Sequence, residues 1–374
     1  MNNCRVCGSV FYQSPLLRYE NMPAVAQFLP DKDSVALDKG VRLEICQCSG
    51  CGLVQLSNDP VAYYKEVIRA AAFSEEMKAF RTKQFDCFVQ KYSLKSRKVI
   101  EIGCGRGEYL SLLQQSGADS YGLEYSKESV KACKGRGLKV AQGFLDEATC
   151  QLDSAPFDAF FILNFLEHLP HPNLALRAIH NNLREAAVGL VEVPNFNMIL
   201  QDNLFYEFIP DHLFYFTKDT LNTALQINGF EVLESSEVWH DYIISSVVRK
   251  KSAFDLSRFY RYQEQLMTEI ECYIHQYKST AIWGAGHQAL AIIALMNLAD
   301  KVKYVVDSAP FKQGKYTPAS HIPIVCPDTL RSDPVDAIIV MAASYSDEVV
   351  RLIKDEFDQK IPIAILKKFG LENV

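Results

Sequence analysis

The chain has 374 residues, of which 48% are hydrophobic and 22% are charged, so it is long enough for two or three globular domains. The formal net charge is −6 and no long basic run occurs, which argues against nucleic acid as the main partner. No apolar run reaches the ~18 residues of a membrane span, and the N-terminus lacks a signal-peptide core, so we expect a cytoplasmic protein without membrane contact.

The first 60 residues contain two close cysteine pairs, each spaced C-x-x-C and followed by glycine. The pairs are Cys4 with Cys7 and Cys48 with Cys51. In a reducing compartment, eleven cysteines favour free thiols and a metal site over disulfides. Four thiolates leave no coordination position open, which is typical of structural Zn²⁺. We therefore predict one structural zinc ion in a zinc-binding domain of residues 1–60; the alternative is four unrelated thiols.

A helical pattern covers residues 60–95, with Ser74 as an N-cap and an apolar stripe that includes Phe80 and Phe85. Two interpretations remain open for the adjacent Tyr63 and Tyr64. They either pack in the ordinary way or belong to a lid over a cofactor site.

The most informative stretch is VIEIGCGRGEYL, residues 99–110. A short apolar strand pattern contains Glu101 and stops at three alternating glycines, Gly103, Gly105 and Gly107, after which a helical pattern begins. Glycines let the backbone approach a ligand closely, and a helix N-terminus offers unpaired N–H groups. A dinucleotide-binding loop is spaced G-x-G-x-x-G instead, and Glu101 would repel its pyrophosphate. The pattern resembles motif I of class I S-adenosylmethionine (SAM) methyltransferases, in which the acid lies near the methionine end.

Strand and helix patterns alternate from residue 96 to about residue 250, which predicts a parallel, doubly wound sheet. We expect strands at 99–102, 120–124, 140–145, 157–163 and 189–194, helices at 129–137 and 218–229, and a strand pair at 230–233 and 243–248.

Ligands in such sheets bind at the carboxyl ends of the strands. Glu124 ends the second strand, 21 residues after Gly103, where an acid accepts hydrogen bonds from a ribose diol. Leu145 follows the third strand and is placed to lie along an adenine, and Asn164 follows the fourth. The coincidence of these strand ends strengthens the prediction of a SAM site.

A long helix over 252–277 leads to a second, smaller Rossmann-like unit. Its strands are expected at 281–283, 303–307, 335–340 and 361–366, and the second of them ends in Asp307. This half lacks the E-x-G-x-G-x-G pattern, so we expect no second SAM site in it.

Taken together, the motifs resemble the sugar C-methyltransferases of deoxysugar pathways over essentially the whole chain. The matching segments are CRVCGS, CSGCGLVQL, VIEIGCGRGEYL, NFLEHLPHP, VEVPN, DHLFYFT, WGAG and YVVDSAPFKQGKYTPASHIPIVCP. The resemblance implies an α/β protein with three domains. These are a zinc-binding domain (1–60), a class I SAM-methyltransferase Rossmann-like core with an N-terminal helical lid (61–250), and a smaller C-terminal Rossmann-like domain (251–374).

The same resemblance implies roles for single residues. His212 would be the general base that removes a proton beside a ketone, with a pKa near neutral, and Asp211 or His168 would orient it or the enolate. The acceptor would be a small molecule, most plainly a nucleotide-linked keto-sugar. The residues implied to hold SAM are Glu101, Gly103, Gly105, Gly107, Glu124, Tyr125, Leu145 and Asn164.

Three segments depart from the family pattern. Ile209-Pro210 replaces a tyrosine-containing stretch before Asp211, His240-Asp241-Tyr242 replaces a glycine-containing hairpin, and residues 286–290 replace a glycine-rich loop. Methylation of oxygen or nitrogen on another small acceptor therefore stays open, as does a non-catalytic SAM- or nucleotide-binding scaffold. The sequence leaves a monomer and a homodimer as alternatives.

Overall fold

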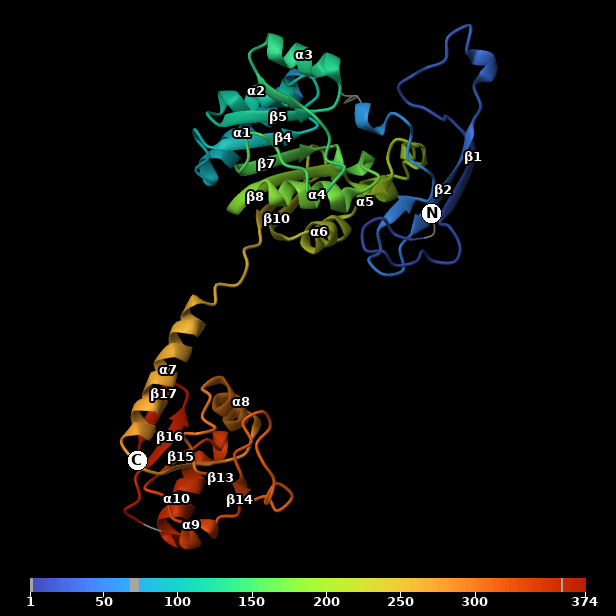
Figure 1. The fold of residues 1–374 in the computed structure, drawn as a ribbon. Helices are drawn as coiled ribbons and strands as arrows, with labels where there is room; N and C mark the ends of the chain where they lie inside the picture. Colours follow the sequence, from blue (N-terminus) through green and yellow to red (C-terminus); the bar gives the residue numbers. More distant parts are fainter. Residues whose placement is uncertain (1–2, 68–73, 358) are drawn as a thin grey trace. The chain divides into compact units, whose positions relative to one another are not determined.

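The computed structural model describes residues 3–67, 74–357 and 359–374, and the chain divides into two compact units, Met1–Ala253 and Phe254–Val374. Each unit has its own sheet and its own hydrophobic core (Figure 1). Part of the helical pattern predicted for residues 60–95 falls on 68–73, outside the described residues. Among the helices of the described residues, none combines the length and apolar character needed to cross a membrane.

The N-terminal part of the first unit is a four-stranded antiparallel sheet. Its fourth strand comes from far along the chain, because Tyr215 pairs with Val54. Two short 3-10 helices belong to this part of the chain: η1 (Val35–Leu37) lies between β1 and β2, and η2 (Tyr64–Glu66) follows β3. The strands are β1 (Leu17–Met22), β2 (Val41–Gln47), β3 (Val54–Leu56) and β9 (Phe214–Tyr215).

A seven-stranded sheet forms the centre of the first unit, in the order β10-β11-β8-β7-β4-β5-β6. Only β11 runs antiparallel to the others, since it pairs antiparallel with both β10 and β8. The predicted α/β fold with a Rossmann-like core is thereby confirmed. The strands are β4 (Lys98–Ile102), β5 (Asp119–Glu124), β6 (Lys139–Gln142), β7 (Phe157–Leu163), β8 (Leu183–Pro194), β10 (Phe230–Val238) and β11 (Ile243–Lys250).

Helices cover both faces of this sheet because its central strands are apolar on both sides. On one face Phe161 packs against Phe85, with ring centroids 5.0 Å apart. On the other face the neighbouring Phe160 joins the core formed with the fourth and sixth helices. The helices are α1 (Glu75–Lys91), α2 (Glu108–Gln115), α3 (Lys127–Gly135), α4 (Pro172–Asn181), α5 (Phe196–Gln201) and α6 (Lys218–Ile227), with the 3-10 turns η3 (Leu166–His168) and η4 (Phe205–Glu207).

The second unit has a six-stranded sheet in the order β14-β13-β12-β15-β16-β17, parallel except for β17. Its elements are α7 (Ser257–His275), β12 (Thr280–Trp283), α8 (His287–Leu295), β13 (Val305–Val306), β14 (Ile324–Val325), α9 (Thr329–Ser332), β15 (Ala337–Val340), η5 (Ala343–Tyr345), α10 (Ser346–Glu356), β16 (Ile363–Lys367) and β17 (Gly370–Asn373).

Candidate active site and metal centre

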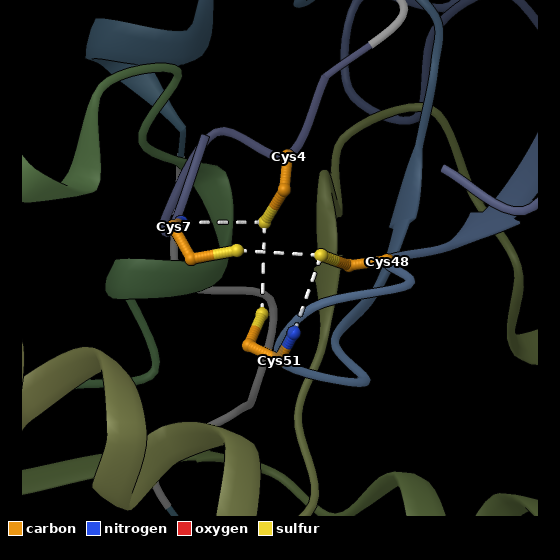
Figure 2. A group of neighbouring side chains, drawn as sticks. All are labelled: Cys4, Cys7, Cys48 and Cys51. Carbon is orange, nitrogen blue, oxygen red and sulfur yellow. Dashed lines mark hydrogen bonds between the residues drawn. The ribbon is translucent and has the colours of Figure 1, made fainter. Parts of the chain in front are cut away.

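The four predicted metal-ligating cysteines come together at the base of the N-terminal sheet, with their sulfur atoms turned toward a common centre (Figure 2). The sulfurs of Cys4 and Cys51 lie 3.7 Å apart and those of Cys7 and Cys48 lie 3.3 Å apart. Main-chain N–H groups point at the sulfurs, as the glycine-containing knuckles predict. Four sulfurs at this spacing fit a closed tetrahedral metal site.

The knuckle around Cys4 also holds the loop that carries His168. Arg5 donates to the carbonyl of Asn58 (2.7 Å) and reaches that of Pro170 (3.5 Å). Asn173 donates to the carbonyl of Val6 at 2.7 Å. Hydrogen bonds therefore connect the cysteine cluster to the segment that follows β7.

The glycine loop turns sharply between β4 and α2. Gly103, Gly105 and Gly107 all have positive φ, at 68°, 55° and 82°. A Cβ on Gly103 would lie 2.8 Å from the Phe165 ring, so no other residue fits there without displacing that ring. Gly103 thus packs directly against Phe165, whereas a Cβ on Gly105 would meet only a carboxylate oxygen of Glu108 at 4.0 Å, so the loop is open at Gly105.

Glu124 ends β5 beside this loop. One carboxylate oxygen accepts from the N–H of Gly105 at 2.9 Å, and the other accepts from the N–H of Ser126 at 2.8 Å. These two bonds fix the carboxylate at the carboxyl end of the sheet, where a ribose diol would meet it.

Asn164 follows β7 in the left-handed conformation, with φ 48°. Its side-chain oxygen is buried and has no hydrogen-bond partner among the described residues. A buried amide oxygen without a partner costs free energy unless a ligand or water donates to it. Asn164 also lines the cavity described next.

One cavity of about 710 Å³ joins these residues to the predicted catalytic ones. Its wall includes Gly103, Gly105, Glu124, Tyr125, Leu145, Asn164, His168, Asp211 and His212. Two predicted residues stand apart from the lining. Glu101 is 1% exposed within β4, and Gly107 is the N-cap of α2. Their positions make them supports of the loop rather than its surface.

His168 and His212 lie next to each other in the wall of this cavity, with ring centroids 4.8 Å apart. Nδ1 of His168 lies 2.8 Å from the carbonyl of Asp211, so this nitrogen carries the proton and Nε2 presents a lone pair. That Nε2 is 3.8 Å from a carboxylate oxygen of Glu167, which is 1% exposed.

The pKa values of both imidazoles are lowered. Burial first, and the neighbouring His168 second, lower the pKa of His212 to about 3. Burial also lowers the pKa of His168, against the hydrogen bond to Asp211. The predicted near-neutral pKa of His212 is therefore not what the structure gives. The sequence alone does not reveal how strongly the fold shields the ring from water.

Asp211 turns its carboxylate toward the N-terminal segment. It accepts from the hydroxyl of Tyr63 at 2.7 Å and from the amide of Gln27 at 3.3 Å. Tyr63 in turn accepts from the N–H of Ala26 at 2.9 Å. Asp211 thus acts on His168 through its main-chain carbonyl, while its side chain ties the His212 loop to residues 26–63.

Several cavity residues were not assigned a role from the sequence. Glu167 lies in the matching segment NFLEHLPHP but was given no role, and Gln27 lies outside the matching segments. Tyr242 lines the cavity from the hairpin in which His240 points outward to Glu76 at 3.6 Å. Lys65 lies over the rings of Phe144 and Tyr125, at 4.8 and 5.5 Å, and pairs with Asp146 at 3.0 Å. The Tyr63–Tyr64 pair was the one available signal, since a lid was among its two interpretations.

The aromatic cluster around His212 divides into two groups. Phe208, Phe214, Tyr215 and Phe216 are buried, whereas Phe205 and Tyr206 are 68% and 62% exposed. The buried members pack beneath the His212 loop in the hydrophobic core.

Comparison with known proteins places two domain families on the chain. Residues 70–235 match a methyltransferase domain, and residues 253–361 match a C-methyltransferase C-terminal domain. The C-methyltransferase NovU of Streptomyces niveus is 21% identical over 94% of this chain and 91% of its own length.

Other similar proteins match a smaller share of the chain. The ubiquinone biosynthesis O-methyltransferase of Methylococcus capsulatus is 33% identical over 91 residues, which are 23% of this chain and 38% of the relative. A SAM-dependent methyltransferase structure from Clostridium acetobutylicum covers 48% of this chain and 96% of its own, with 11% identity and a TM-score of 0.40.

Proposed function

We propose a carbon-methylation reaction on a nucleotide-linked keto-sugar for this chain, which belongs to the SAM-dependent C-methyltransferases. One observation carries the proposal. His168 and His212 line the same cavity as the glycine loop and Glu124, so a methyl donor and an acceptor have room to meet at the imidazoles. The keto-sugar is the acceptor that the motif resemblance favours.

The residues present fit SAM. Gly105 leaves the backbone open beside the cavity, Glu124 is placed for a ribose diol, and the buried side-chain oxygen of Asn164 has no hydrogen-bond partner among the described residues. Leu145 and Tyr125 complete the wall beside the adenine. SAM, when bound, supplies an electrophilic methyl group on a sulfonium.

His212 removes the proton from the acceptor carbon next to the ketone. The C–H bond breaks, the proton goes to the imidazole, and the electron pair leaves an enolate that is nucleophilic at carbon. With its pKa lowered to about 3, the imidazole is neutral and has a free lone pair throughout the physiological pH range. The imidazolium that forms needs negative charge nearby, and the buried carboxylate of Glu167 lies in the same group as His168 and His212.

The role of His212 is tested by the His212→Gln variant. We expect turnover to fall about 10²- to 10⁴-fold, the range of a lost general base, because the amide cannot take the proton. SAM affinity by calorimetry should change less than about twofold, since the residues proposed to hold SAM are untouched. His171→Gln, an exposed histidine at the N-cap of α4, serves as the matched control.

A deuterium label on the acceptor carbon separates the alternatives. Loss of deuterium on methylation would support proton abstraction at carbon. Retention would favour transfer to oxygen or nitrogen, and full activity of His212→Gln would exclude the base role.

We also propose that residues 1–60 form a structural zinc domain in which Cys4, Cys7, Cys48 and Cys51 hold one Zn²⁺. Protein purified without added metal should contain one zinc per chain by elemental analysis. Cys48→Ser should lose the ion and destabilise the N-terminal sheet, because structural zinc contributes directly to folding. Cys46→Ser, whose thiol lies outside the cluster, is the control; zinc-free wild-type protein would contradict the proposal.

A further inference from the structure

The acceptor end of the cavity contains a second group of metal-type ligands, separate from the four cysteines. A carboxylate oxygen of Glu167 and one ring nitrogen each of His168 and His212 all lie within 4.8 Å of one another. The first two come from η3 after β7, and the third comes from the loop before β9. We propose that these three side chains bind a divalent transition-metal ion of the Zn²⁺, Co²⁺ or Ni²⁺ type.

The ligand set is of the right chemical kind. Two imidazoles and one carboxylate are a recurring donor set for first-row transition metals, and three protein ligands leave a coordination position for water or a substrate oxygen. Glu167 is 1% exposed and His168 is 7% exposed, so the ion would sit in a largely water-excluded wall.

The orientation of His168 is the second argument. A metal-ligating histidine almost always donates its other ring N–H to a carbonyl or carboxylate, which fixes the tautomer. The Nδ1 of His168 bonds to the carbonyl of Asp211 at 2.8 Å, so its Nε2 faces Glu167 with a lone pair. Tyr63 and Gln27 hold Asp211 from the other side and so support that carbonyl.

Access is the third argument. All three ligands line the cavity of about 710 Å³, so an ion can reach them without unfolding the loop. The site uses the lone pair of His212 that the proposed function assigns to proton removal. The ion is therefore an inhibitor of methyl transfer, a consequence that rests on the proposed function.

Equilibrium dialysis of the full-length, zinc-containing protein against Co²⁺ tests the site without any acceptor. We expect one cobalt per chain in addition to the zinc of the cysteine cluster, measured by elemental analysis. The Glu167→Gln and His212→Gln variants should bind cobalt at least about tenfold more weakly, as loss of a ligand requires. His171→Gln should bind it like the wild type, and unchanged SAM affinity shows that each variant is folded.

Absence of the additional cobalt in the wild-type protein, or equal cobalt affinity in the folded variants, would overturn the metal site. Inhibition of methyl transfer by Co²⁺ that a chelator reverses would support both the site and the base role. Cobalt binding that leaves methyl transfer unchanged would support the metal site and contradict His212 as the base, so the two failures can be told apart.

Discussion

The seven-stranded sheet of the first unit and the six-stranded sheet of the second contain a similar glycine turn in different surroundings. In the first unit the N–H of Gly105 bonds to the carboxylate of Glu124 at 2.9 Å. In the second unit the N–H of Ala285 bonds to the carboxylate of Asp307 at 2.8 Å. Glu124 is the last residue of β5 and Asp307 directly follows β13, and each of these strands neighbours the strand that leads into the glycine turn, so the two units share this backbone arrangement.

The two carboxylates differ in the groups that surround them. Asp307 also receives the Lys312 ammonium at 2.9 Å and the N–H of Ala309 at 2.9 Å, so a cation of its own unit satisfies it. Glu124 receives two N–H groups and lines the large cavity. Of the two acids, Asp307 is therefore paired with a lysine, whereas Glu124 lines the cavity in which we propose that SAM binds.

A second contrast concerns the exposure of one ion pair in each unit. Under the first sheet, Arg81 of α1 pairs with Glu192 of β8, and both side chains are 0% exposed. Gln84 and Ser245 donate to the same carboxylate at 2.5 and 2.8 Å. The Lys312–Asp307 pair of the second unit is partly exposed, at 27% and 11%.

The largest expected effect is therefore that of Arg81→Met. Removing one partner leaves the Glu192 charge buried, which should lower the unfolding free energy of the first unit by about 3–5 kcal/mol. Thermal or denaturant unfolding of the full chain measures it. Lys91 lies on the same helix as Arg81 and forms an exposed pair with Glu234 of β10. Lys91→Met should therefore lower the unfolding free energy by at most about 1 kcal/mol. Equal losses in the two variants would contradict the contrast.

The next effect concerns the two acids. Glu124→Gln should weaken SAM binding about 10- to 100-fold, because hydrogen bonds to a charged acceptor contribute about 1.5–3 kcal/mol. Asp307→Asn, the matched change in the second unit, should leave SAM affinity unaltered. Calorimetric titration with SAM compares them, and a similar loss in both variants would remove the distinction drawn between the sheets.

The smallest effect is a pH dependence of the second unit. Burial alone would raise the pKa of the Asp307 carboxyl, but hydrogen bonds from Lys312, Ala309 and Ala285 outweigh it and hold the pKa below the ordinary 3.8. Since the folded pKa is the lower one, this stabilisation is present above the unfolded pKa and is lost as the pH falls through the folded pKa. Unfolding of the second unit should show this acid-dependent loss in the wild type and a smaller one in Asp307→Asn.

Local sequence pattern was enough to predict the centre of the seven-stranded sheet. The strand expected at 157–163 has those bounds, and the glycine loop and Glu124 lie together as predicted. Pattern served less well at element ends. The long helix expected from residue 252 begins at Ser257, after Phe254, which is 97% exposed. β8 begins at Leu183 rather than 189, because pairing with β7 carries its polar start into the sheet.

The sequence identified cavity residues that follow the strands, such as Glu124 and Asn164. It did not reveal contacts between segments that are far apart in the chain. Tyr63 and Asp211 are 148 positions apart, and no periodicity or motif links them. Glu167 stands next to His168 in the sequence, yet its role follows only from the fold, which brings His212 to the same point. The low pKa of His212 likewise depends on burial by segments that meet only in the folded chain.

The pairing of β9 with β3 joins two segments that lie far apart in the chain. The N–H of Leu56 bonds to the carbonyl of Leu213 at 3.0 Å, and Val54 pairs with Tyr215, so the residues beside His212 close a very long loop of chain. Contacts of such high sequence separation form slowly, because the entropy of loop closure is lost before the contact is gained. We therefore expect the segment that carries His212 to reach its final position late in folding, once β9 has paired with β3.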